Sequence, residues 1–154
     1  MFMQLTEFTD NALRLLIYLG GHRERVATIG EIADRYGVSR HHLAKVSCVL
    51  AASGLIETSR GRLGGMRLAG SPRDIRLGEV VRCTERSLAQ GAVADDPDDR
   101  LQQSLAVATA AYLAELNRVT LADLLAGEEG PQRAVPNWLV PAAWSRGHAG
   151  VEGA

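Results

Sequence analysis

Arginine and glycine are concentrated in residues 59–68, a segment with three of each in ten residues. The arginines are Arg60, Arg62 and Arg67. Guanidinium groups bind phosphate oxygens and also enter narrow minor grooves of DNA. Glycine permits a tight turn and a close approach of the backbone to another surface. Because short strand-like runs flank the segment, we expect a basic β-hairpin that binds a polyanion.

A second polar group precedes the hairpin, at the start of a predicted helix. Its members are Ser39, Arg40, His41, His42 and Lys45. These side chains lie on the face opposite the apolar positions of the helix, so they are open to a partner. Two adjacent histidines also suggest a metal, but neighbouring helix positions diverge and no third ligand is near. We therefore expect no metal site.

Capping signals define the helices that position these polar groups. Thr28 and Glu31 form a capping box, and the short helix that they open ends at Tyr36-Gly37. Ser39 then caps a longer helix that ends at Ser53-Gly54. A short helix, a tight turn and a longer helix have helix-turn-helix spacing. The second helix of such a pair enters the major groove of DNA.

The remaining expected elements give a mainly α fold with a small β-hairpin wing. An N-terminal helix, with Thr9 as its N-cap, ends at Gly20-Gly21. We expect a winged helix-turn-helix domain over residues 1–72. Residues 73–127 then hold a linker helix, an acidic loop and a long helix, and residues 128–154 form a Pro- and Gly-rich tail with both tryptophans, Trp138 and Trp144.

The long helix, predicted from residue 100 to 117, carries its largest apolar residues at intervals of three or four. Such a narrow stripe is typical of a helix that packs on another helix. We favour packing on a second copy of the chain over an intramolecular core, because a two-fold protein matches a two-fold DNA site. The stripe consists of Leu101, Leu105, Ala108, Tyr112 and Leu116.

Composition and charge limit the classes of function. The sequence has no apolar run long enough for a membrane span and no secretory signal at its start. Its two cysteines make no disulfide framework, which favours a cytoplasmic protein. Residues 1–72 carry a net charge of +3, whereas residues 73–154 carry −4. No catalytic motif or phosphate-binding loop is present, so we do not expect an enzyme.

Several ordered motifs resemble the Rrf2 family of bacterial winged-helix regulators, and the nitric-oxide-sensing repressors of that family are the most similar. The resemblance covers roughly residues 3–126. The matching segments are residues 4–10 (QLTEFTD), 12–14 (ALR), 36–40 (YGVSR), 60–61 (RG), 64–65 (GG), 67–68 (RL), 75–82 (IRLGEVVR), 100–101 (RL) and 121–124 (LADL).

The resemblance implies a homodimer that binds double-stranded DNA at a pseudo-palindromic operator and represses stress-response genes, whether nitrosative, redox or iron-related. It implies that Ser39, Arg40, His41 and Lys45 read the major groove and that Arg60 enters the minor groove. We add Thr28, His42 and Arg62 as expected DNA contacts, since they belong to the same capped helices and wing.

Members of the family that hold an iron–sulfur cluster have three cysteines in the loop before the long helix. Here that loop contains none, and Asp99 stands directly before Arg100-Leu101. We therefore expect no cofactor. Asp10 aligns with an aspartate that ligates the cluster in some members, and Cys83 precedes the loop, so these two are the candidate sensor residues.

Three possibilities for how DNA binding is regulated remain open. The first is thiol oxidation at Cys83 or at Cys48, although we expect Cys48 to be packed within its helix. The second is a small ligand, and the third is constitutive DNA binding.

Overall fold

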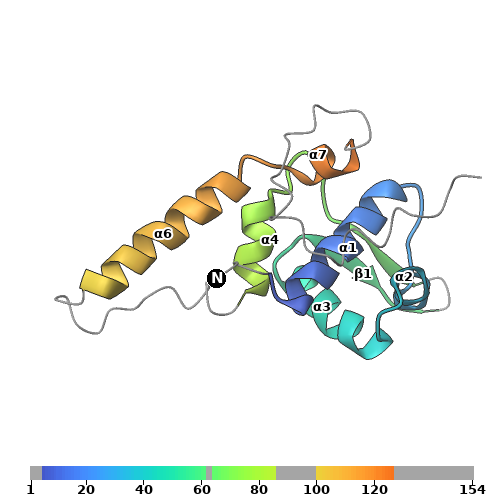
Figure 1. Ribbon diagram of the computed structural model, residues 1–154. Helices are drawn as coiled ribbons and strands as arrows, with labels where there is room; N and C mark the ends of the chain where they lie inside the picture. Colours follow the sequence, from blue (N-terminus) through green and yellow to red (C-terminus); the bar gives the residue numbers. More distant parts are fainter. Residues whose placement is uncertain (1–4, 62–63, 86–99, 127–154) are drawn as a thin grey trace, which may run out of the picture.

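The computed structural model of the protein describes residues 5–61, 64–85 and 100–126. The described part is mainly helical, with one two-stranded antiparallel sheet, which confirms the expected fold class (Figure 1). None of the helices in these ranges is long and apolar enough to cross a membrane. In chain order the elements are α1 (Glu7–Gly21), α2 (Ile29–Tyr36), α3 (Arg40–Ala52), β1 (Ile56–Ser59), β2 (Gly65–Leu68), α4 (Leu77–Thr84), α6 (Arg100–Leu116) and α7 (Leu121–Leu125).

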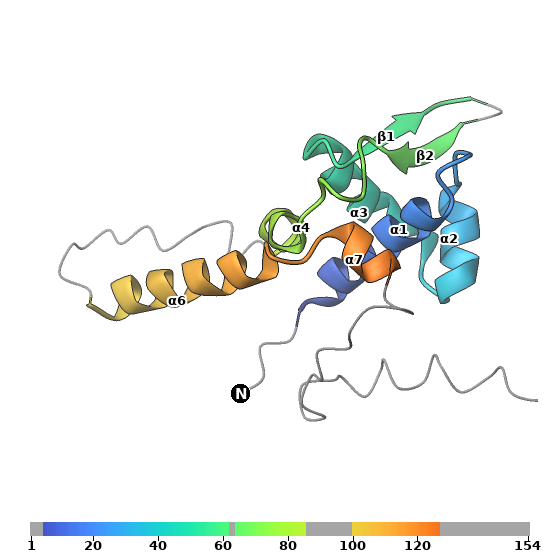
Figure 2. The ribbon, with the colours of Figure 1, turned by 90° about the horizontal axis from the view of Figure 1, so that it is seen from above.

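Helix α1 is the central element of the body and contacts α2, α3, α4, α7 and β2. Helix α6 touches the body mainly through α4 near its C-terminal end, and its N-terminal end extends away from the other helices (Figures 1 and 2). The β-hairpin projects from a different side of the body than α6 (Figure 2). The molecule thus presents a wing and a long helix in different directions.

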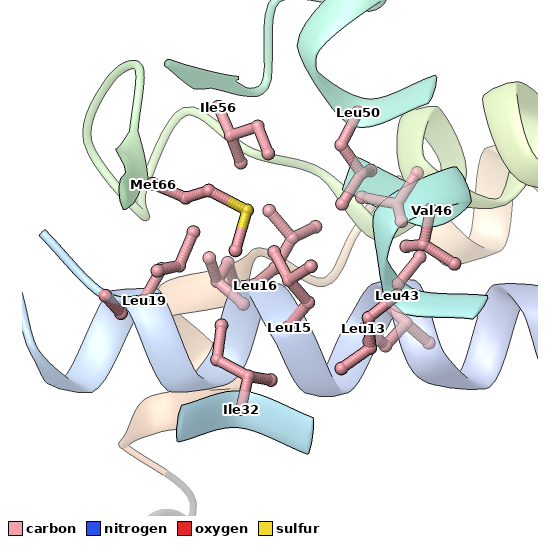
Figure 3. Packing of buried hydrophobic residues seen from close by; sticks show 14 of the residues in the cluster. Leu13, Leu15, Leu16, Leu19, Ile32, Leu43, Val46, Leu50, Ile56 and Met66 are labelled. Carbon is pink, nitrogen blue, oxygen red and sulfur yellow. The ribbon is translucent and has the colours of Figure 1, made fainter. Parts of the chain in front are cut away.

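The hydrophobic core forms around one face of α1 (Figure 3). Its almost completely buried members include Leu15, Leu16, Leu19, Ile32, Leu43, Val46, Leu50, Val80 and Leu121. Burying each leucine or isoleucine stabilises the fold by about 1.5–3 kcal/mol relative to an exposed side chain. Since Val80 and Leu121 share this core with α1–α3, the packing is continuous across the domain boundary expected at residue 72.

Two of the three N-caps expected from the sequence are confirmed. Thr28 forms a capping box with Glu31, and the Ser39 hydroxyl accepts from the backbone N–H of His42. Thr120 forms a further capping box at the start of α7. The prediction that Thr9 caps the first helix was wrong, because α1 begins earlier and Thr6 is the N-cap. The Thr6 hydroxyl accepts from the Thr9 backbone N–H, and Thr9 lies buried inside the first turn.

The hairpin pairs β1 with β2 in the register Ile56↔Leu68. Gly64 is needed at the tip, because a Cβ there would collide with the carbonyl oxygen of Ser59. Met66 also exchanges backbone hydrogen bonds with Ala27, at 2.9 and 2.7 Å, which attaches the hairpin to the segment before α2. The wing is therefore anchored at its base to the helix-turn-helix.

Candidate nucleic-acid interface

Helix α3 is the predicted recognition helix, and its position is set by burial of one face. Leu43, Val46 and Leu50 are at most 1% exposed, and they pack in the core with α1. The opposite face exposes His41 and Lys45. Because the buried face holds α3 rigidly, the exposed side chains in its first turns are presented to a partner in a fixed arrangement.

Arg40 is the one expected base-reading residue that the structure directs toward another helix. Its guanidinium lies 3.4 Å from the Asp34 carboxylate of α2 and packs over Gly30. Both charged side chains are about 70% exposed, at 69% and 72%. An ion pair this exposed contributes about 0–1 kcal/mol. Arg40 can therefore exchange Asp34 for a phosphate or a base at little cost.

The two adjacent histidines occupy different environments. His41 is exposed, whereas His42 is half-buried and its ring centroid lies 5.9 Å from that of Phe8. The Nε2 atom of His42 is buried and has no hydrogen-bond partner in the described part of the chain. No group of three metal-binding side chains occurs there either. Thus His41 faces solvent, while His42 lies at the seam between α3 and α1.

Thr28 is exposed at the N-terminus of α2, but its polar groups already have partners. Its hydroxyl accepts from the Glu31 backbone N–H, and its own backbone N–H donates to the Glu31 carboxylate at 2.9 Å. That backbone bond and the Arg25 guanidinium hold the pKa of Glu31 below its usual value. Thr28 therefore serves first to start α2, and a DNA contact would come in addition.

One exposed arginine of the wing takes part in no ion pair among the described residues. That residue is Arg60, directly after β1. Arg67 instead donates two hydrogen bonds to Glu57 across the hairpin, at 2.9 and 2.7 Å. Arg62 lies outside the described residues. The structure thus distinguishes Arg67, which is paired within the hairpin, from Arg60, which is exposed and in no ion pair of the described residues.

Helix α6 is largely solvent-exposed in the single chain. Of its residues only Leu113 is buried, and it lies where α6 contacts α4. Within the predicted stripe, Leu101 and Leu105 are 65% and 50% exposed, and Ala108 is exposed as well. Tyr112 and Leu116 are half-buried. Val107, outside that stripe, is 71% exposed. The helix is therefore apolar on more than one exposed face.

This combination of a fixed helix-turn-helix, a basic wing and a projecting helix agrees with comparisons to known proteins. A family profile described as "Rrf2: Iron-dependent Transcriptional regulator" matches residues 5–127. The chain belongs to the Rrf2 family. Its relatives are transcription regulators, which are not enzymes, and it is accordingly an NsrR-like, winged-helix DNA-binding regulator.

Two curated relatives carry the name HTH-type transcriptional regulator NsrR. The one from Shouchella clausii is 41% identical over 136 residues, which cover 82% of this chain and 91% of the relative. The one from Halalkalibacterium halodurans is 40% identical over 136 residues and is covered to 93%. Similarity at this level extends over most of the chain.

Solved structures support the same fold. IscR of T. potens aligns with a TM-score of 0.68 at 28% identity, covering 90% of this chain and 97% of that one. CymR, described as the global cysteine regulator of B. subtilis, aligns with a TM-score of 0.66 at 25% identity and covers 81% and 98%. Both match this Rrf2 regulator over nearly their full length.

An iron–sulfur cluster of the family's kind does not fit the residues present. Such clusters need several cysteine thiolates, and this regulator has only Cys48 and Cys83, on different helices. Asp10, the aligned acid, forms an ion pair with Arg14 one turn later, at 2.8 Å. The donor set therefore lacks the thiolates that would hold a cluster.

Cys83 does not have the environment of a reactive thiolate. Burial raises the pKa of the Cys83 thiol, which also donates a hydrogen bond to the Val80 carbonyl oxygen at 3.1 Å. This disfavours oxidation of Cys83 at neutral pH, since the thiolate is the reactive form. The expectation that Cys48 is packed was wrong: it is exposed. Position 48 lies on the exposed side of α3, away from Val46 and Leu50.

Glu85, directly after α4, is a polar residue of this region that the sequence did not single out. It is only 7% exposed, and its Oε1 accepts from Thr6 N at 2.7 Å, Thr6 Oγ1 at 2.9 Å and Thr9 Oγ1 at 2.6 Å. Burial raises the pKa of this carboxyl, but the three hydrogen bonds outweigh burial and the pKa is lowered. Glu85 thus fastens the end of α4 to the start of α1.

Proposed function

We propose that this Rrf2 regulator is a homodimeric repressor that binds a pseudo-palindromic operator and controls genes of a nitrosative, redox or iron-related stress response. The observation that carries the proposal is α3, held in the core on one face and exposing polar side chains on the other. The similarity to two relatives named NsrR supports the choice of genes.

In this proposal each exposed side chain has a distinct task. His41 and Lys45 meet base edges and phosphates in the major groove, with Ser39 at the N-terminus of α3. Arg40 breaks its ion pair with Asp34 and also contacts DNA in the major groove. Arg60 reaches the adjacent minor groove, where a narrow groove attracts a guanidinium.

The dimer uses α6. A helix with apolar side chains on several faces is stable in water when those faces are covered. Leu105 and Val107 are exposed, and both belong to the N-terminal half of α6. A second copy of α6 would bury them and set two recognition helices about one DNA turn apart, as a palindromic operator requires.

DNA binding is tested by fluorescence anisotropy with the promoter upstream of the regulator's own gene and with a scrambled duplex of equal length. We expect the promoter to be preferred, and we expect Arg60→Ala to weaken binding by about 1–3 kcal/mol. Arg118→Ala is the matched control, because Arg118 is exposed, pairs with Glu115 and lies outside the wing. Equal affinity for both duplexes would contradict sequence-specific regulation.

The regulator acts without an iron–sulfur cluster in this proposal. Protein purified without oxygen is expected to be colourless in visible absorption, with no stoichiometric iron or sulfide. A brown protein that contains both elements would overturn this part and leave the DNA-binding proposal intact.

A further inference from the structure

A groove of about 600 Å³ lies beside the recognition helix. It is formed where the start of α1, one face of α3 and the end of α4 meet (Figure 1). Thr6 and Phe8 line it from α1, His42 and Lys45 from α3, and Cys83 and Glu85 from the end of α4. Sites for small molecules typically measure about 300–1,000 Å³, so the groove has the size of a ligand site.

The α4 side of the groove carries a negative charge that forms no ion pair with any described residue. Glu85 is nearly buried, and no ion pair in the described ranges includes it. Three donors from α1 converge on its Oε1. They fix the carboxylate in place but supply no positive charge. Because a buried charge is stabilised most by an opposite charge, a cationic ligand group would be favoured there.

The α3 side of the same groove carries positive charge and hydrogen-bonding capacity. Lys45 lines it with an ammonium group, which carries three hydrogen-bond donors, and the His42 ring forms part of the same wall. Phe8 and Val49 add apolar surface between the charged groups.

We propose that this groove binds a small zwitterion of the free α-amino acid class with an apolar side chain. Its ammonium group lies on Glu85, its carboxylate lies on Lys45, and its side chain packs on Phe8 and Val49. The ligand and DNA then compete for Lys45, which belongs both to the groove and to the exposed face of α3. The competition with DNA rests on the proposed function, whereas the binding of the amino acid to the groove does not.

Binding is measured without DNA, on the full chain, by ligand-observed NMR with each of the twenty protein amino acids. At least one amino acid with an apolar side chain is expected to bind. Its deaminated acid and its decarboxylated amine, each lacking one charge, are expected to bind at least tenfold more weakly, since each loses a charge-assisted hydrogen bond. Absence of binding by all twenty, or equal binding of the one-charge analogues, would overturn the proposal.

Two variants test whether the ligand binds in the groove. Glu85→Gln removes the charge and keeps an oxygen for the threonine donors, and Lys45→Met removes the ammonium from an exposed side chain that the core does not need. Each is expected to weaken binding at least tenfold. The matched controls are Glu79→Gln on α4 and Arg118→Met, both exposed and outside the groove, and both are expected to bind normally. Normal binding by both groove variants would refute the site.

Competition is then tested by adding the bound amino acid to the complex of the regulator with its promoter DNA. We expect the apparent Kd for DNA to rise in proportion to ligand concentration, and to stay constant with Lys45→Met at matched DNA occupancy. Unchanged DNA affinity with a ligand that binds would refute the competition. Failure to bind any DNA would refute the proposed function, and the NMR result would stand independently.

Discussion

Replacing Glu85 by alanine tests whether one buried carboxylate holds the start of α1 against the end of α4. The substitution removes the acceptor of the buried Thr9 hydroxyl and of the Thr6 hydroxyl and backbone N–H, although the single Thr9 hydroxyl hydrogen can turn to Thr84 Oγ1, 2.8 Å away. An unsatisfied buried donor costs about 1–3 kcal/mol, and bonds to a charged acceptor are at the strong end. Since Thr9 is partly rescued, we expect a loss of about 2–4 kcal/mol.

The assay is thermal unfolding by circular dichroism at one fixed protein concentration, because dimerisation makes Tm depend on concentration. For a chain of this size each kcal/mol lowers Tm by about 2–4 °C, so Glu85→Ala should melt about 5–15 °C lower. Glu79→Ala is the matched control on the exposed side of α4, expected within about 0.5 kcal/mol of the parent. Equal Tm values for the two variants would refute the role of Glu85.

Because Glu85 ionises, its contribution to the free energy of unfolding should depend on pH. Its pKa lies below the ordinary value of 4.5, so its stabilisation is complete above that pH and is lost as pH falls through the lower folded pKa. The difference in unfolding free energy between the parent and Glu85→Gln should therefore be constant near neutrality and shrink in acid. A difference that is independent of pH down to about pH 3 would show that folding leaves the pKa of Glu85 unchanged, which contradicts a pKa lowered by its hydrogen bonds.

Two further substitutions test the wing and the long helix. Gly64→Ala should weaken DNA binding at least tenfold with little change in Tm, because a Cβ there collides with the Ser59 carbonyl oxygen at an exposed tip. Gly70→Ala, where a Cβ meets nothing within 4 Å, is the control, and equal DNA affinities would count against the wing. Leu105→Glu should shift sedimentation from dimer to monomer by placing a charge in the α6 contact, whereas Ser104→Glu on an exposed polar position should not. An unchanged dimer with Leu105→Glu would place the interface elsewhere.

Local patterns predicted the helix-turn-helix because its signals involve residues three or four apart. The Thr28–Glu31 capping box, the Ser39 cap and the left-handed Gly37 between the helices all follow from short-range hydrogen bonds and backbone preference. The first helix was placed too late because Thr6 and Thr9 are both plausible caps. Only the burial of Thr9 in the tertiary structure separates them.

The sequence by itself determined the fold class, the recognition helix, the basic wing and the loss of the family's loop cysteines, since each depends on residue type and short spacing. Only the tertiary structure decided that Arg40 pairs with Asp34, that Cys48 is exposed and that His42 faces Phe8. It also revealed Glu85, whose donors lie 76 and 79 residues away along the chain. No periodicity encodes such contacts, because they arise only when the core brings α1, α3 and α4 together.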